Sequence, residues 1–260
     1  MSTTHSPAAP TLVAVAHGSP DPRAQLAVRS LTRLLAALRP RLRVELGHLE
    51  TDRPLLTDTL ARLRGEVVLV PLLFGRGYHV KQDIPAALAR APHLRATIAG
   101  CLGPHPLLAA ALHGRLTEAG YRPGSPVVLA AAGSRDPESA ASTEHTADLL
   151  SARLGGVPVL PAYASAARPT VAEAVTTLRE QGHRPEDIAL ASCFIAPGLF
   201  ATRCAEAAPG VTAAPLAGHP ALARLLLHRY DQARAAAEGT ASAGGPARRP
   251  GDAWLGAVAG

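Results

Sequence analysis

One internal offset organises this sequence of 260 residues. The segment AHGSPDP at residues 16–22 recurs as AAGSRDP at residues 131–137, a shift of 115 residues. The Arg-Pro pair at residues 53–54 recurs at residues 168–169 with the same shift. Two motifs so far apart keep one offset only if the surrounding chain is repeated as well. The repeat therefore predicts two similar lobes, at residues 11–122 and 126–232.

Later matches drift slightly, as insertions and deletions in loops would make them do. Gly77 pairs with Gly198 at a shift of 121 residues, and the His-Pro pair at residues 105–106 recurs at residues 219–220, a shift of 114. After residue 232 the sequence is rich in Ala, Gly, Pro and Arg and has no period. That composition predicts a disordered tail at residues 233–260.

Each half alternates short runs rich in Val and Leu with segments of helical period, a pattern typical of βα units and a parallel sheet. The fold class predicted is α/β, with two similar lobes that each hold a four-stranded parallel sheet flanked by helices. The predicted strands are residues 12–16, 44–49, 67–73 and 96–101 in the first half, and 127–131, 157–160, 188–194 and 211–216 in the second. Helices are expected on residues 26–38, 55–63 and 106–120, and from near Pro137, Pro169, Gly198 and Pro220.

Candidate functional side chains follow three predicted strands of the first lobe. His17 follows the first strand, Glu50 the second and His79 the third. The carboxyl ends of parallel strands meet at one edge of a sheet, which is where ligands bind in such folds. A single histidine there more often caps a helix or satisfies a turn, and a single glutamate is usually a solvated loop charge.

The second lobe strengthens the functional interpretation. The positions that match the two histidines and the glutamate hold Ala132, Phe200 and Ser165, whereas the glycines and prolines of the loops are kept. Residues needed for folding would be present in both lobes, so the three groups are predicted to act together. Neutral imidazole is a common ligand of divalent Fe, Co, Ni and Zn, and two histidines with one carboxylate leave coordination positions open.

The segment AHGSPDP at residues 16–22 and a second motif near the end of the third predicted strand resemble the paired motifs of the class II sirohydrochlorin chelatases. These enzymes insert cobalt or iron in cobalamin and sirohaem synthesis. The residues that carry the likeness are Ala16-His17-Gly18-Ser19, Asp21-Pro22, Pro71-Leu72-Leu73-Phe74, Gly77-Tyr78-His79-Val80 and Asp83-Ile84-Pro85. The likeness spans both lobes. In the commonest family form an Arg follows the Ser, whereas here Pro20 does and the Arg stands at Arg135 of the second lobe.

The resemblance implies that His17 and His79 bind the metal and take part in catalysis, and that Glu50 is the third catalytic group. It implies Fe²⁺ or Co²⁺ as a metal substrate, sirohydrochlorin as the other substrate, and no nucleotide. We expect Fe²⁺ insertion to give sirohaem, with cobalt insertion as the alternative. Asp83, which precedes Pro85, is interpreted as a helix start rather than a ligand.

The net charge of +6 favours an anionic partner, and no basic run beside aromatics points to nucleic acid. Sirohydrochlorin is a polycarboxylate, and we expect it in a cleft between the lobes. The predicted substrate-binding residues are Ser19, Arg76, Lys81 and Arg53, with Arg23 as a further steering charge.

Three other functions are alternatives to this one. A dinucleotide-dependent oxidoreductase would need a third glycine after Gly75-Arg76-Gly77, and a serine hydrolase would need a Gly-x-Ser-x-Gly elbow around Ser19. A carrier of metal or tetrapyrrole that does no chemistry would keep the same histidines.

The sequence also sets expectations about the environment of the chain. Three cysteines without a CxxC pair favour a reducing cytoplasm, and neither a leader nor a membrane span is expected. A monomer or a homodimer fits equally.

Overall fold

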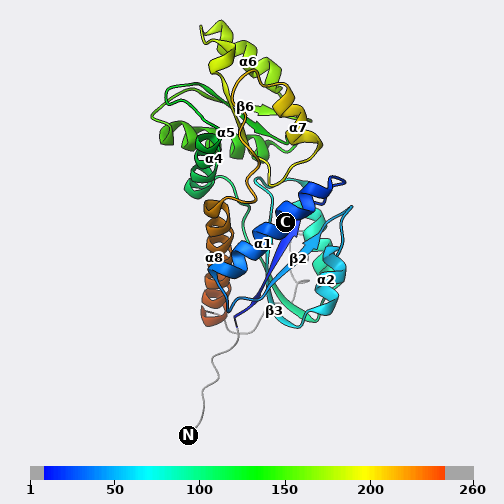
Figure 1. The fold of residues 1–260 in the computed structure, drawn as a ribbon. Helices are drawn as coiled ribbons and strands as arrows, with labels where there is room; N and C mark the ends of the chain where they lie inside the picture. The colour runs from blue at the N-terminus through cyan, green and yellow to red at the C-terminus, as the bar shows by residue number, and fades with distance from the viewer. Residues whose placement is uncertain (1–8, 244–260) are drawn as a thin grey trace, which may run out of the picture.

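The computed structural model describes residues 9–243 and shows two lobes, one above the other in Figure 1. The elements of the first half of the sequence are β1 (Thr11–Ala16), α1 (Pro22–Leu38), β2 (Val44–His48), α2 (Leu56–Arg62), β3 (Gly65–Pro71), the π-helical turn η1 (His79–Asp83), α3 (Ile84–Ala89), β4 (Leu94–Ile98) and α4 (Pro106–Glu118). Those of the second half are β5 (Val127–Ala131), α5 (Pro137–Arg153), β6 (Val159–Tyr163), α6 (Val171–Glu180), the 3₁₀ turn η2 (Pro185–Asp187), β7 (Ala189–Ser192), α7 (Leu199–Glu206) and α8 (Pro220–Ala243).

Both sheets are parallel, which confirms the predicted α/β class. The first sheet has four strands in the order β2-β1-β3-β4, and the second has three in the order β6-β5-β7. The prediction of a fourth strand at residues 211–216 was wrong, because this segment forms only an isolated bridge between Thr212 and Leu190. Pro215 lies within this segment and has no amide hydrogen to extend a ladder.

Matched backbone hydrogen bonds show that the lobes repeat one plan. The amide of Glu50 donates to the carbonyl of His17, and that of Ser165 donates to Ala132, each over 3.0 Å. Two further matched bonds, Leu72 to Val15 and Cys193 to Ala130, are both 2.8 Å long. The offsets of 115 and 121 residues are therefore the true structural correspondences.

The last helix of each half covers the sheet of the other half. Helix α4 packs against α5 and β7, and α8 packs against α1, β3 and β4. Figure 1 shows α4 beside α5 in the upper lobe and α8 beside α1 in the lower lobe. Each lobe is completed by a helix from the other half.

Helix α8 also corrects the predicted start of the tail. It continues to Ala243, so residues 233–243 are helical; residues 244–260 of the predicted tail lie outside the described part of the chain. The helix is tied to the first lobe because the buried hydroxyl of Tyr230 donates to the carbonyl of Pro10 at 2.7 Å. Arg39 donates two hydrogen bonds, of 2.7 and 2.6 Å, to the carboxylate of Asp231.

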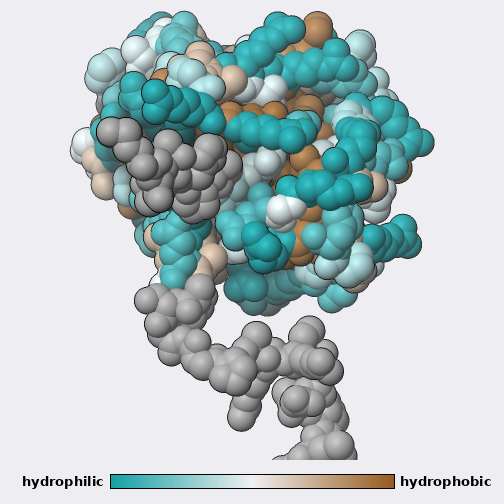
Figure 2. All heavy atoms as spheres, turned by 90° about the horizontal axis from the view of Figure 1, so that it is seen from below, coloured by the Kyte–Doolittle hydropathy of each residue, from teal (hydrophilic) through white to brown (hydrophobic). Residues whose placement is uncertain are grey.

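Aliphatic side chains fill the space between each sheet and its helices. One large core continues through both lobes, and two smaller cores lie on the outer faces of the sheets. On the face seen in Figure 2, hydrophilic side chains predominate and hydrophobic ones appear in strips between them. No helix in the described part of the chain is long and apolar enough to cross a membrane.

The repeated turn after the first strand of each lobe should tolerate no side chain. We expect Gly133→Ala to lower the free energy of unfolding by about 3 kcal/mol, because a Cβ there would lie 1.9 Å from the carbonyl oxygen of Ser165 at a φ of +87°. The control is Gly120→Ala, at a φ of +88° with nothing within 4 Å of the added Cβ, which should cost about 1 kcal/mol. Urea denaturation measures both values, and equal losses would contradict the steric argument.

Candidate active site in the cleft between the lobes

A cavity of about 1010 Å³ lies between the two lobes at the carboxyl ends of their strands. The first lobe lines it with the loop after β1 and the segment from Leu72 to Gln82. The second lobe contributes the loop after β5 and the segment from Cys193 to Ala201. The cleft is therefore where sheet topology places a ligand.

The three predicted catalytic residues do lie close together. His17 follows β1, and its Nδ1 is 3.3 Å from Oε1 of Glu50 in the loop after β2. The rings of His17 and His79 are 4.5 Å apart between centroids and nearly perpendicular, at 84°. The two imidazoles line the cavity, while Glu50 lies behind His17 and is exposed.

His79 has a carboxylate partner of its own, in Asp83. The π-helical turn η1 brings Oδ2 of Asp83 to 2.6 Å from Nδ1 of His79. A helix does begin at this point, as predicted, with Pro85 in the first turn of α3. Asp83 stands at the N-cap position of α3, as the helix-start interpretation predicted, but its carboxylate makes no capping hydrogen bond and contacts His79 instead.

The neighbours of both imidazoles determine which ring nitrogen holds the hydrogen. Nδ1 of His17 faces two acceptors, the carbonyl of Gly18 at 3.3 Å and the carboxylate of Glu50. Nδ1 of His79 faces the carboxylate of Asp83. Carbonyls and carboxylates only accept, so each neutral ring carries its hydrogen on Nδ1 and keeps its lone pair on Nε2. Two ligand-competent nitrogens thus remain for an ion or a proton.

Sequence reasoning gave no role to a third imidazole that lines the cavity. His48, at the end of β2, is buried, and its Nδ1 donates to the carbonyl of Pro54 over 3.1 Å. Its Nε2 is buried and has no hydrogen-bond partner among the described residues. The alternation of sides along β2 is the signal that could have placed His48 at the base of the cleft.

At the positions that match the two histidines, the wall contributed by the second lobe is apolar. Phe200 takes the place of His79, and Ala132 that of His17, and both line the cavity. Leu199 and Phe200 remain exposed although they are large and hydrophobic. Exposed apolar groups that flank a cavity favour contact with an apolar ligand surface.

Of the three cationic residues predicted to contact the substrate, Lys81 lines the cavity and the two arginines do not. Lys81 lines the cavity, but its Nζ contacts Asp136 at 2.6 Å and Glu138 at 3.1 Å across the cleft, and these hydrogen bonds raise the pKa of Lys81. It therefore joins the two lobes. Neither Arg53, which lies 3.8 Å from Asp58, nor Arg76 is among the residues that line the cavity, so their role as substrate contacts stays a prediction.

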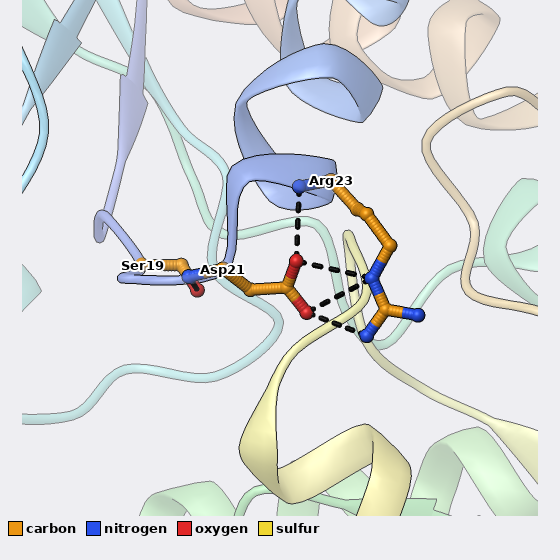
Figure 3. Close-up of polar contacts among 3 residues, drawn as sticks. All are labelled: Ser19, Asp21 and Arg23. Atoms are coloured by element: carbon orange, nitrogen blue, oxygen red, sulfur yellow. Dashed lines mark hydrogen bonds and ion pairs between the residues drawn. The ribbon is translucent and has the colours of Figure 1, made fainter.

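The loop after β1 is held by its own hydrogen bonds. Ser19 lines the cavity, with its backbone nitrogen donating to Asp52 and its hydroxyl accepting from the amide of Asp21. Figure 3 shows that the backbone nitrogen and the guanidinium of Arg23 both donate hydrogen bonds to the carboxylate of Asp21. That hydrogen bonding lowers the pKa of Asp21. Arg23 is thus already paired within its own lobe.

No group of three or more His, Cys, Asp or Glu side chains in residues 9–243 is arranged to enclose a metal ion. The two histidines are therefore a pair of donors, and an ion bound between them would take further ligands from solvent or from a second substrate.

The tautomers of the two imidazoles can be measured directly. We expect nitrogen-detected NMR at mildly alkaline pH to find His17 and His79 with hydrogen on Nδ1, whereas free imidazole side chains favour Nε2. In Asp83→Ala, His79 should change to the Nε2–H form while His17 keeps its own, because only His79 loses its acceptor. An unchanged His79 in that variant would contradict the assignment.

Both halves of the chain are similar to known proteins. Residues 11–119 and residues 126–233 each match the family model described as CbiX. A segment of 79 residues is 33% identical to a sirohydrochlorin cobaltochelatase of Sulfurisphaera tokodaii, and covers 29% of this chain and 66% of that protein. A segment of 49 residues is 45% identical to a protein of the same name in Saccharolobus islandicus, and covers 17% of this chain and 38% of that protein.

Two solved structures share the fold. SirB from Bacillus subtilis with Fe³⁺ has a TM-score of 0.73 at 21% identity, over 89% of this chain and 98% of that one. The structure of CbiX, described as the terminal enzyme for biosynthesis of siroheme in denitrifying bacteria, has a TM-score of 0.66 at 22% identity, over 86% and 99%. Since the family model matches both lobes and most of the sequence, this chain belongs to the CbiX family.

Proposed function

We propose that the protein is a sirohydrochlorin chelatase, which inserts a divalent metal ion into sirohydrochlorin in the cleft between its lobes. The observation that carries the proposal is the pair of imidazoles, His17 and His79, each backed by a carboxylate and each replaced by a side chain that binds no metal in the other lobe. The chain matches relatives named as cobaltochelatases over only part of their length, so the shared name supports the activity without establishing it.

The geometry suits the proton balance of the reaction. Metal insertion replaces two pyrrole N–H protons with one divalent ion. His17 and His79 hold the ion through Nε2 before transfer, and each nitrogen becomes free to accept a proton as the ion passes to the ring. Asp83 accepts a hydrogen bond from Nδ1 of His79, and Glu50 lies 3.3 Å from Nδ1 of His17, so each carboxylate stabilises the imidazolium ion that forms beside it. Two histidine–carboxylate pairs thus match two protons.

The donor set is compatible with both Fe²⁺ and Co²⁺, since imidazole binds either ion. One similar solved structure holds Fe³⁺ and another, of SirB from a Bacillus subtilis subspecies, holds cobalt. The expectation of Fe²⁺ as the cellular substrate stays a prediction. Parallel rates with the two ions, measured without oxygen, test it.

Removal of either imidazole should abolish the insertion of both metals. For His17→Ala and His79→Ala we expect the rate with sirohydrochlorin and Fe²⁺ or Co²⁺ to fall at least about 100-fold, while the circular dichroism stays unchanged. The matched control is His183→Ala, a histidine outside the cavity, which should keep the wild-type rate. Wild-type activity in both site variants would refute the assignment. A wild-type protein that binds both substrates without exceeding spontaneous insertion would instead be a carrier.

The role of Glu50 is separable from metal binding. We expect Glu50→Gln to lower the insertion rate about 100-fold and the affinity for Co²⁺ less than about 10-fold, because the neutral amide keeps the shape of the side chain beside His17 but cannot offset an imidazolium charge. Calorimetry with Co²⁺ alone and single-turnover rates separate the two effects. A loss of affinity as large as the loss of rate would make Glu50 a metal ligand.

A further inference from the structure

Arg135 lies in the loop between β5 and α5, where the first lobe has Pro20. It is exposed and lines the cavity from the side of the second lobe. Of the residues described along the cavity wall, Lys81 and Arg135 are those that carry a fixed positive charge.

Two other cations beside the cleft are already paired. Lys81 binds Asp136 and Glu138, and Arg23 binds Asp21. Arg135, in contrast, makes no ion pair or side-chain hydrogen bond with another residue of the described range 9–243. Its guanidinium is thus the charge in the cleft that is available to an incoming anion.

Lys81 pairs with the acidic residues that lie closest to Arg135 in the sequence. These residues are Asp136 and Glu138. Lys81 reaches across from the first lobe and contacts both, and this contact lowers the pKa of Asp136. The first lobe thereby satisfies the acidic side chains of the second and leaves its arginine facing the cavity.

We propose that Arg135 binds a carboxylate of the tetrapyrrole and so fixes how the macrocycle enters the cleft. This inference rests on the proposed function. The planar guanidinium can bind a carboxylate through two parallel hydrogen bonds, which lysine cannot do. The exposed side chains of Leu199 and Phe200 on the same lobe lie against the cavity and suit the apolar face of the ring. The second lobe then holds the organic substrate, and the first lobe holds the ion.

Binding of a metal-free tetrapyrrole tests the proposal without relying on turnover. Uroporphyrin, a stable polycarboxylate porphyrin, can be titrated while its absorbance and the protein fluorescence are followed. We expect Arg135→Gln to bind it about tenfold more weakly than wild type and Arg135→Lys to recover only part of the loss. The affinity for Co²⁺ alone should be unchanged in both variants.

The matched control is Arg122→Gln, which removes an exposed arginine that pairs with Asp187 outside the cavity. It should bind uroporphyrin like wild type and show that the general positive charge of the protein is not responsible. Raising the salt concentration should weaken wild-type binding more steeply than that of Arg135→Gln, because one charge contact is missing in the variant.

The possible results separate this inference from the proposed function. Equal uroporphyrin affinity in wild type and Arg135→Gln would overturn the role of Arg135 and leave the chelatase proposal standing. A wild-type protein that bound neither uroporphyrin nor sirohydrochlorin would overturn both. A loss in Arg135→Gln that Arg122→Gln reproduced would reduce Arg135 to a general electrostatic effect and so contradict the proposal.

Discussion

The site depends on the close approach of Gly18 to the loop after β2. A Cβ at Gly18 would lie 1.9 Å from the carbonyl oxygen of Glu50, and the backbone there has a φ of +106°. Only glycine allows the two loops to meet, and their meeting sets His17 beside Glu50. Gly133 makes the same approach to Ser165 in the second lobe, where no such side-chain pair follows. The backbone constraint is therefore independent of the chemistry that the first lobe carries, because both lobes keep it.

The two lobes are held together by the exchange of two helices as well as by contacts across the cleft. Helix α4 covers the sheet of the second lobe and α8 covers that of the first. Separating the two halves of the sequence would therefore expose the apolar core beneath each helix. Across the cleft, a Cβ on Gly198 would lie 3.5 Å from Oγ of Ser19, and one on Gly77 would lie 3.6 Å from Oγ of Ser134. These matched contacts place loops from both lobes at the rim. Lys81 adds an ion pair on one side only, since Thr202 stands at its matching position.

The sequence predicted most of the fold because the relevant signals are local. Apolar runs and the repeated loop motifs located seven of the eight expected strands, and the carboxyl ends of those strands identified His17 and His79. The exchange of α4 and α8 could not be predicted, because an apolar helix face looks the same whichever sheet it covers. The partners of His79 and Lys81 were missed for a similar reason. Asp83 meets His79 only in a π-helical turn, and Lys81 meets Asp136 only after the lobes have docked.

The duplication explains how the two faces of the cleft could come to differ. A single lobe must bind the ion, position the macrocycle and hold its own loops with one set of residues. Two lobes with one backbone plan can divide these tasks, provided that the glycines at the loop contacts are kept. In the first lobe the free loop positions hold His17 and His79, and in the second the matching positions hold Ala132 and Phe200. These replacements are apolar and bind no metal, so the second lobe offers the ligand an apolar contact and the metal donors stay in the first lobe.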